Sequence, residues 1–371
     1  MSEQSPLTPL QRYEHDLTRP GFRADPAQRA AVEALEDLYH RLLRHRAARQ
    51  SLVGRFKSRF GTTEVVQGLY FWGGVGRGKT YLMDSFFESL PFEQKMRAHF
   101  HRFMREVHAD LKRLAGQKNP LEQVADGIAA RAQVLCFDEF FVSDITDAMI
   151  LAGLMDGLFR RGVTLVATSN IVPDGLYKDG LQRARFLPAI DLLNRYTQVI
   201  NVDGGVDYRL RALEQAELYH APLDAAANES LQASFDSLIV GGSEVHEDIA
   251  LDIEGRSITA YREADDVAWF EFEALCDGPR SQNDYIELAR EYHAVLVGNV
   301  PQFDSSREDQ ARRFINLVDE FYDRSVKLVL SAAVPLEQLY AGQRLIFEFE
   351  RTVSRLLEMQ SHEYLARPHK P

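Results

Sequence analysis

Residues 73–80 combine glycines, a lysine and a threonine at a spacing that suits the binding of phosphate groups. They read Gly-Gly-Val-Gly-Arg-Gly-Lys-Thr, which matches the pattern G-x-x-x-x-G-K-[ST] at each fixed position. Glycines let successive backbone N–H groups turn inward around phosphates, because they carry no Cβ atom. In such a loop the lysine, here Lys79, reaches the β- and γ-phosphates, and the hydroxyl of Thr80 is a ligand of Mg²⁺. We therefore predict a nucleoside triphosphate site formed by Gly73, Gly74, Val75, Gly76, Arg77, Gly78, Lys79, Thr80 and Tyr81.

Two adjacent acids follow an apolar run further along the chain. Residues 134–137 are apolar and lead into Asp138 and Glu139. Buried parallel strands read in this way, and open α/β sheets bind their ligands at the carboxyl edge of such strands. Asp138 would there hold the Mg²⁺ shell together with Thr80, and Glu139 would be the general base that activates water. The alternative is a strand that runs into an acidic turn, which the position of the pair after the phosphate loop disfavours.

A third apolar run, residues 163–169, ends at Asn170. An amide at this place could orient water near the γ-phosphate; a strand-end turn, helped by Pro173, is the alternative. The tetrapeptide N-K-x-D, with which switch GTPases usually read guanine, does not occur in the sequence. The three features together indicate an ATPase with a glutamate base, and ATP and Mg²⁺ as its nucleotide and metal.

The elements that position these groups are readable from the hydrophobic pattern. Apolar runs predict strands at residues 68–72, 95–100, 134–137, 163–169 and 197–202. Helical spacing predicts helices at residues 25–50, 81–87, 101–115, 120–132, 145–159 and 181–195. Strands and helices thus alternate, which predicts an α/β P-loop NTPase fold with a mostly parallel sheet and helices on both faces.

The second half of the chain has a different pattern. From residue 244 to 277 apolar and polar residues alternate with period two, and this stretch holds eleven acids and two bases. We expect antiparallel strands with one strongly negative face. Further α/β elements follow, and no internal repeat is evident. The predicted segments are an N-terminal helical segment at 1–66, the P-loop core at 67–203, a linker with an acidic antiparallel β insertion at 204–280, and a C-terminal α/β and helical region at 281–371.

Composition bounds the class of protein. The chain has 371 residues, 26% of them charged, and a formal net charge of −12. This charge argues against a general affinity for nucleic acids or anionic membranes. The two cysteines, Cys136 and Cys276, predict no disulfide framework, and no apolar signal segment opens the sequence. We therefore expect a cytoplasmic protein with at most peripheral membrane contact. A basic run at residues 41–59 is either a solvated face or a docking surface for an acidic partner, lipid or nucleic acid.

Motifs outside the phosphate loop give the chain a family resemblance. The motifs are HFHRFM at 99–104, LCFDEF at 135–140, LQRARFLP at 181–188, FERTVSRL at 349–356 and EMQ at 358–360. Together with the phosphate loop they resemble the ZapE cell-division ATPases. The resemblance covers nearly the whole chain and implies an AAA+-type ATPase. Bacterial members are thought to destabilise polymers of the tubulin-like protein FtsZ at the division ring, and mitochondrial relatives serve protein quality control at the inner membrane. The absence of a transit peptide favours the bacterial kind.

The resemblance also implies roles for arginines. AAA+ proteins act as rings in which a neighbouring subunit donates an arginine to the nucleotide, where a permanently charged guanidinium stabilises the transition state. Arg183 and Arg185 lie in the region where such fingers occur; Arg195 is a less favoured candidate, and surface ion pairs are the alternative for each. Arg312 or Arg313 could act as a second sensor of the nucleotide, and only one of them can face it because adjacent helical residues point about 100° apart.

Three further hypotheses concern single residues. Phe103 and Met104 lie where ring unfoldases often carry a pore loop, although packing in a helical core is favoured. The histidines His99, His101 and His108 could form a metal site, but no cysteine or carboxylate completes one at ligand spacing. Asp25 and Gln28 could approach the adenine.

We expect an ATP-dependent homo-oligomer that remodels FtsZ or another division-ring protein, recruited to the division site, without stable binding of nucleic acid. The alternatives are a nucleic-acid-linked switch such as a helicase loader, which the basic run would serve, and a membrane-associated quality-control ATPase.

Overall fold

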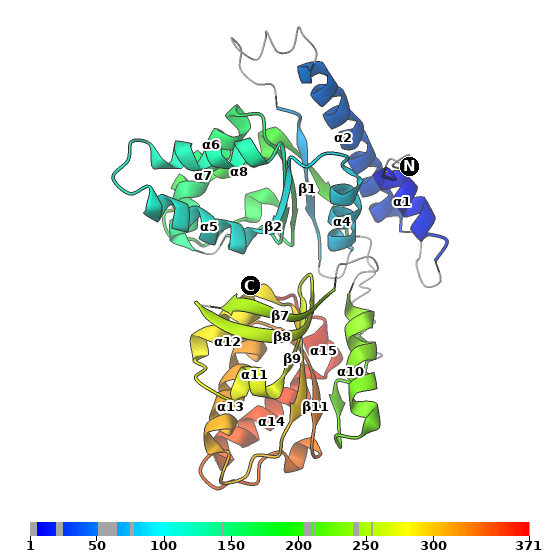
Figure 1. Ribbon diagram of the computed structural model, residues 1–371, viewed down its shortest axis with the longest axis vertical. Coiled ribbons are helices and arrows are strands. Elements are labelled where there is room, and N and C mark those ends of the chain that lie inside the picture. The colour runs from blue at the N-terminus through cyan, green and yellow to red at the C-terminus, as the bar shows by residue number, and fades with distance from the viewer. Residues whose placement is uncertain are drawn as a thin grey trace. The chain divides into compact units, whose positions relative to one another are not determined.

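The computed structural model describes residues 6–19, 25–50, 65–74, 78–142, 144–203, 210, 213–214, 216–239, 245–253 and 255–370. The chain forms two compact units, Met1–Val206 (unit 1) and Asp207–Pro371 (unit 2) (Figure 1). No helix among the described residues is long and apolar enough to cross a membrane. Both cysteines, Cys136 and Cys276, are buried and free.

Unit 1 begins with two capped helices. In α1 (Pro9–Asp16) the Thr8 side chain accepts from the N–H of Gln11 in a capping box. In α2 (Pro26–Gln50) the carboxylate of Asp25 accepts from the N–H groups of Ala27 and Gln28, at 2.7 and 3.2 Å. The predicted helix at 25–50, with its acidic cap and proline at the first position, is confirmed.

A five-stranded parallel sheet lies at the centre of unit 1. Its strands are β1 (Gly68–Trp72), β2 (Lys95–His99), β3 (Val134–Asp138), β4 (Thr164–Ser169) and β5 (Thr197–Asn201). Their order is β2-β3-β4-β1-β5, and every pairing is parallel. The helices are α4 (Lys79–Ser89), α5 (Phe100–Arg113), α6 (Pro120–Arg131), α7 (Ile145–Arg160) and α8 (Leu187–Tyr196). The predicted α/β fold with a mostly parallel sheet is confirmed.

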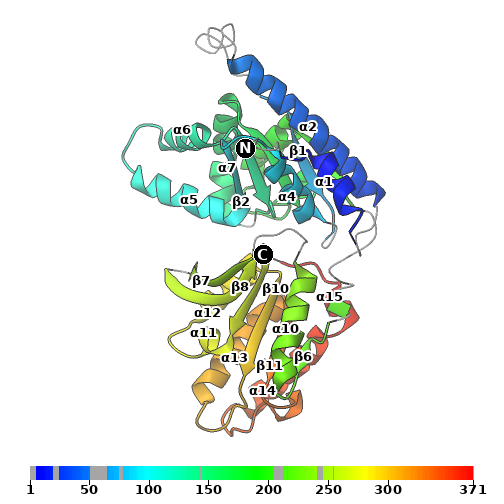
Figure 2. The same ribbon diagram turned by 45° about the vertical axis from the view of Figure 1, so that its right-hand side comes forward.

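The helices cover both faces of this sheet (Figures 1 and 2). Helices α5 to α8 contribute to one core with Leu135 and Phe137 of β3. Helix α4 packs on β3 and β4, and α1 and α2 pack on α4. Because alternate residues of a strand face opposite sides, a strand covered on both faces is apolar along its length, as β3 is until its last residue.

One predicted helix is wrong in its first half. The expected helix at 181–195 begins only at Leu187, and the preceding residues form a turn that includes the 3₁₀ segment η2 (Arg183–Arg185). Gln182 has φ of 57°, a left-handed conformation that no α-helix contains. Pro188 then occupies the first turn of α8, where its missing N–H needs no partner.

Unit 2 is built on a six-stranded mixed sheet. Its strands are β6 (Tyr219–His220), β7 (His246–Ile253), β8 (Arg256–Ala264), β9 (Val267–Glu271), β10 (Ala294–Val300) and β11 (Lys327–Ala332). They lie in the order β6-β11-β10-β9-β8-β7, in which β7-β8 and β8-β9 are antiparallel and the other pairs parallel. The acidic antiparallel strands therefore continue the sheet of the α/β elements that follow them.

Helices pack on both faces of this second sheet. They are α10 (Ala225–Leu238), α11 (Phe272–Cys276), α12 (Gln282–Glu291), α13 (Glu308–Asp323), α14 (Ile346–Met359) and α15 (His362–Leu365). Helix α10 contributes Leu231 and Phe235 to a core with Trp269 of β9. Helices α11 to α14 pack with Phe270 of β9 in a separate core on the other face.

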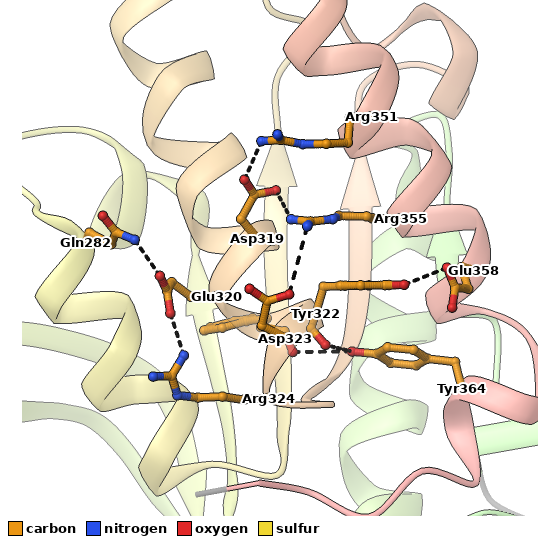
Figure 3. Close-up of polar contacts among 11 residues, drawn as sticks. Gln282, Asp319, Glu320, Tyr322, Asp323, Arg324, Arg351, Arg355, Glu358 and Tyr364 are labelled. Carbon is orange, nitrogen blue, oxygen red and sulfur yellow. Dashed lines mark hydrogen bonds and ion pairs between the residues drawn. The ribbon is translucent and has the colours of Figure 1, made fainter.

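Polar contacts fix α14 on α13 (Figure 3). Asp319 of α13 accepts hydrogen bonds from Arg351, at 2.6 Å, and from Arg355. Tyr322 donates to Glu358 at 2.7 Å. The two arginines of the C-terminal motif at 349–356 thus have a structural role in the packing of these helices.

Candidate nucleotide site

The phosphate-loop sequence connects β1 to α4. Gly78 is the N-cap of α4 with φ of 77°, a left-handed conformation that glycine adopts without a Cβ penalty. Lys79 and Thr80 form the first turn of the helix, whose N-terminal N–H groups and dipole favour an anion. Tyr81, the last residue predicted to bind the nucleotide, is buried and donates to Asp16 of α1 at 2.9 Å. Val75, Gly76 and Arg77 lie outside the described residues.

Lys79 joins three segments at the carboxyl edge of the sheet. Its ammonium group donates to the carbonyl oxygens of Gly73 and Gly74, at 2.8 and 2.6 Å, and to Asn170 Oδ1 at 2.8 Å. Gly73 and Gly74 directly follow β1, and Asn170 directly follows β4. The structure thus brings together two residues that the sequence assigns to one site from segments 91 positions apart.

Asp138 supplies a buried carboxylate at the end of β3. The residue is 6% exposed. Oδ2 accepts from Arg97 Nε at 2.7 Å, while the buried Oδ1 has no hydrogen-bond partner in the part of the chain that the structure describes. Buried carboxylate oxygens are normally paired, and Mg²⁺ prefers carboxylate and hydroxyl oxygens as ligands. The orphaned Oδ1 and the hydroxyl of Thr80 therefore fit a magnesium site.

Glu139 follows in an unusual backbone conformation. Its φ is 52°, which residues other than glycine rarely adopt. The N–H of Glu139 donates to Thr168 Oγ1 at 3.3 Å, and the N–H of Phe140 donates to the Thr168 carbonyl at 2.7 Å. Helix α7 then starts with Asp144 as its N-cap. Contacts to β4 thus fix the turn that carries the predicted general base.

Arg97 is a site residue that the sequence analysis missed. It lies in the middle of β2 and pairs with both Asp84 of α4 and Asp138 of β3. Burial opposes the charged form, but the two carboxylates outweigh it and raise the pKa of Arg97 above its ordinary value. An arginine between Met96 and Ala98 in an otherwise partly buried strand is the signal that could have found it.

The N-terminal segment reaches the phosphate loop. Gln28 of α2 is buried, and its Nε2 lies 2.3 Å from the point where a Cβ on Gly78 would stand. Asp25, also buried, caps α2. Gln28 therefore lies against Gly78 at the loop, and a side chain on Gly78 would have to displace the Gln28 amide. The contact of Asp25 and Gln28 with an adenine stays a prediction.

The candidate finger arginines differ in their surroundings. Arg183 is half-buried and donates to the Asp174 carbonyl at 2.7 Å. Arg185 is exposed, and its side chain makes no hydrogen bond or ion pair with the described parts of the chain. Arg195 is exposed and stacks over the ring of Tyr196 at 5.3 Å. Arg185 is thus the most available of the three for a partner outside its own chain.

The second-sensor candidates lie on α13 in unit 2. Arg312 pairs with Glu348 at 3.4 Å, and Arg313 donates to the Cys276 carbonyl at 3.1 Å. Both therefore have partners inside unit 2, and a role toward the nucleotide stays a prediction.

Phe103 and Met104 pack in the core of unit 1, where they are 2% and 1% exposed, and this packing favours the core interpretation over a pore loop.

Of the histidines considered as metal ligands, His108 pairs with Asp147 at 2.6 Å. No group of three or more potential metal ligands among histidine, cysteine and acidic side chains occurs in the described ranges.

The basic run is partly used within unit 1. Arg46 donates to Gln94 and Gln133, at 2.7 and 3.1 Å, and Arg41 donates to the Gln67 carbonyl at 2.7 Å. Both arginines thus tie α2 to the sheet, and residues 51–64 lie outside the described ranges.

Comparisons with known proteins show which family the chain belongs to. The family model of the AFG1-like ATPases matches residues 7–368. The chain is 51% identical to the cell division protein ZapE of Escherichia coli (strain K12), over 98% of each chain. It is 38% identical to the lactation elevated protein 1 homolog B of Danio rerio, over 80% of this chain and 68% of the relative. Among solved structures, DnaA of Aquifex aeolicus with bound AMPPCP covers 52% of the chain at 15% identity and a TM-score of 0.35. The chain belongs to the AFG1-like ATPase family.

Proposed function

We propose that this protein hydrolyses ATP at the carboxyl edge of the unit 1 sheet and uses the hydrolysis to remodel a protein of the division ring. The observation that carries the proposal is the convergence of Lys79, Asn170 and the Asp138–Glu139 pair, which follow three different strands of one parallel sheet. Membership of an ATPase family supports the nucleotide as ATP.

Different residues of the chain would bind the phosphates, hold the metal ion and activate the attacking water. Backbone N–H groups of the phosphate loop and the N-terminus of α4 hold the phosphates, and Lys79 exchanges its carbonyl partners for the β- and γ-phosphate oxygens. Thr80 and Asp138 would hold Mg²⁺, which would neutralise part of the phosphate charge. Glu139 accepts the proton of the attacking water, and Asn170 aligns that water.

A neighbouring subunit completes the site in this proposal. The γ-phosphate gains negative charge toward the transition state, and a guanidinium from outside the chain can stabilise it. Arg185 is the candidate, because it is exposed and has no partner in the described parts of its own chain. The exposed side chains of Leu181 and Leu187 beside it, 69% and 42% accessible, support contact of this segment with a second copy.

The client is inferred from the named relative. The Escherichia coli protein is described as a cell division protein, and the identity of 51% extends over nearly the whole chain. We propose FtsZ as the client, with polymer destabilisation as the outcome and recruitment to the division site as the location.

Light scattering of GTP-assembled FtsZ tests this proposal. Wild-type protein with ATP should lower the scattering, and Glu139→Gln with ATP should not match it. Wild type without nucleotide is the control for simple binding. No change with a wild-type preparation that hydrolyses ATP would contradict FtsZ as the client, and tests of DNA and anionic liposomes would follow.

A further inference from the structure

Arg97 lies between two carboxylates beside the predicted metal site. Its Nε donates to Asp138 Oδ2 at 2.7 Å, and its Nη1 pairs with Asp84 Oδ1 of α4. The side chains of Arg97, Asp84 and Asp138 are 21%, 15% and 8% exposed. The arginine therefore links the helix that follows the phosphate loop to the strand that carries the metal-binding acid.

The contact leaves one oxygen of Asp138 available. Because Oδ2 is held by Arg97, the carboxylate cannot rotate freely, and the buried Oδ1 keeps one orientation. Hydrogen bonds of this kind to metal ligands commonly tune metal affinity by about 10- to 100-fold. A lysine could not replace both contacts equally well, because only the guanidinium offers several donors in a fixed planar fork.

We propose that Arg97 is a positioning residue of the magnesium site: it holds Asp138 so that Oδ1 faces the metal, and Asp84 fixes the guanidinium in turn. This proposal rests on the proposed ATPase function. Arg97 needs no contact with the nucleotide for this role, so its replacement should change the metal dependence and leave metal-free nucleotide binding unchanged.

Binding of a fluorescent ATP analogue to the full chain, in EDTA and across a Mg²⁺ titration, tests the role. Arg97→Met should raise the half-saturating Mg²⁺ concentration by about 10- to 100-fold, while the affinity in EDTA stays within about twofold of wild type. Arg97→Lys should recover part of the loss. The matched control is Arg113→Met, which removes an exposed arginine that pairs with Asp110.

Each outcome decides the question. Wild-type Mg²⁺ dependence in Arg97→Met, with a cooperative melting transition, would overturn the proposal. Equal losses in Mg²⁺ and EDTA in both Arg97 variants would overturn it too, because they indicate a purely structural role. Since the readout is binding, a wild-type protein that binds nucleotide but fails to hydrolyse it would contradict the proposed function separately.

A second, independent observation concerns unit 2. Its strands β9-β10-β11-β6 lie in the order in which unit 1 has β2-β3-β4-β1, and all of these neighbours are parallel. Helix α13 lies between β10 and β11 in the chain, as α7 lies between β3 and β4, and both have 16 residues. The two units therefore share one topology from strand to strand.

The strand registers also coincide. In unit 1, Val134 of β3 pairs with Lys95 and Thr164 on its two sides. In unit 2, Ala294 of β10 pairs with Val267 and Lys327. Each of these residues opens its strand, so the three strands start level in both sheets.

Single hydrogen bonds repeat at matching places. Tyr70 of β1 donates its hydroxyl to the Ile171 carbonyl at 2.8 Å, and Tyr219 of β6 donates its hydroxyl to the Val334 carbonyl, also at 2.8 Å. Tyr70 pairs with Ala167 of β4, and Tyr219 pairs with Leu330 at the corresponding place in β11. Shared topology alone does not require tyrosines at these matching positions.

The backbone conformation near the end of the central strand, β3 in unit 1 and β10 in unit 2, repeats as well. Glu139 has φ of 52° and donates its N–H to the hydroxyl of Thr168 at 3.3 Å. Asn299, at the matching position near the end of β10, has φ of 60° and donates its N–H to the hydroxyl of Ser331 at 3.1 Å. A rare backbone conformation, with the same partner type, thus occurs at the same place in both units.

The chemistry of the first unit is missing from the second. By strand register, Gly298 stands where unit 1 has Asp138, Asn299 replaces Glu139 and Trp269 replaces Arg97. The Asn299 amide donates to Glu271 at 2.7 Å. Neither of the two positions that carry the metal ligand and the general base in unit 1 holds an acid in unit 2, and the nearby carboxylate of Glu271 comes from the neighbouring strand β9.

Unit 2 also lacks a phosphate loop at the place where unit 1 has one, between its first parallel strand and the helix that follows. Between β6 and α10 lie only residues 221–224, without glycine or lysine. The carboxylate of Asp224 caps α10 by accepting from the Ala226 N–H at 2.9 Å, and it also contacts His220 at 3.0 Å. A negative side chain thus occupies the helix terminus where a phosphate would bind, and it would repel one.

We infer that unit 2 is a second copy of the ATPase scaffold that has lost its nucleotide site, so each chain binds one nucleotide, in unit 1. Equilibrium dialysis with ATP and photo-cross-linking with an azido-ATP test this on the full chain. We expect about one bound nucleotide per chain. We also expect the cross-linked label that excess ATP prevents to lie only within residues 1–206. Two nucleotides per chain, or ATP-competed label at residues 216–226, would overturn the inference. Lys79→Ala should lose the binding, and a full site retained in that variant would also contradict it.

Discussion

The ammonium group of Lys79 lies 2.8 Å from Asn170 Oδ1, so the lysine of the phosphate loop contacts the residue that directly follows β4. This contact links the phosphate-binding lysine to the amide that we expect to align water. Nucleotide binding and water positioning should therefore separate by mutation, because in the proposed site the lysine, and not the Asn170 amide, contacts the phosphates.

Lys79→Ala should weaken ATP binding by about 100-fold or more, since it removes the side-chain cation from the phosphates. Asn170→Ala should bind ATP within a fewfold of wild type and hydrolyse it at least about tenfold more slowly. Isothermal titration and phosphate release measure the two quantities. Equal binding losses in both variants would contradict the division of roles.

Arg185→Ala should lower turnover by about 1,000-fold with ATP binding preserved, as for arginines that act on a transferred phosphoryl group. If the arginine acts across subunits, mixing Arg185→Ala with Lys79→Ala should restore activity, because some interfaces combine an intact loop with an intact arginine. Mixing Lys79→Ala with Glu139→Gln is the control and should stay inactive, since every nucleotide site then carries a defect from its own chain. An inactive mixture of Arg185→Ala with Lys79→Ala would argue that Arg185 does not act across subunits. Equal activity in both mixtures would argue the same.

The fold elements with strong local patterns could be predicted from the sequence. The strand at 68–72 and the helix at 25–50 carry apolar runs or caps that need no distant partner. The proximity of Lys79 to Asn170 could also be expected, because carboxyl ends of parallel strands share one edge of the sheet.

Other features depend on contacts that are distant in sequence. Helix α10 was not predicted: Leu231, Phe235 and Leu238 have helical spacing, but the segment after Pro222 is rich in alanine and serine and reads as a linker. The partners of Arg97 are 13 and 41 residues away. The likeness of the two units survives in backbone conformation and hydrogen bonds, while most side chains differ.

His369 gives unit 2 a pH dependence with a definite sign. It is 6% exposed, and its Nε2 donates a hydrogen bond to the Ala289 carbonyl at 2.6 Å. Burial lowers the pKa of His369 to about 4, with His293 and Lys327 acting in the same direction, and Ala289 and Asp266 against it.

An unfolded histidine has a pKa of about 6.5, so between pH 6.5 and 4 the unfolded chain binds a proton that the folded chain refuses. The unfolding free energy of unit 2 should fall by up to about 3 kcal/mol over this window and be unaffected by this group at higher pH. His369→Asn should show a smaller fall in urea titrations at pH 7.5, 5.5 and 4.5. Parallel pH profiles for the two proteins would contradict the assignment.

The central claim is that Glu139 activates the water that attacks ATP, and steady-state phosphate release by Glu139→Gln beside wild type tests it most directly. The amide has nearly the same shape but cannot accept the proton, so we expect turnover to fall by about 100- to 10,000-fold while ATP binding stays within about threefold of wild type. A variant that binds ATP and retains wild-type turnover would contradict the claim.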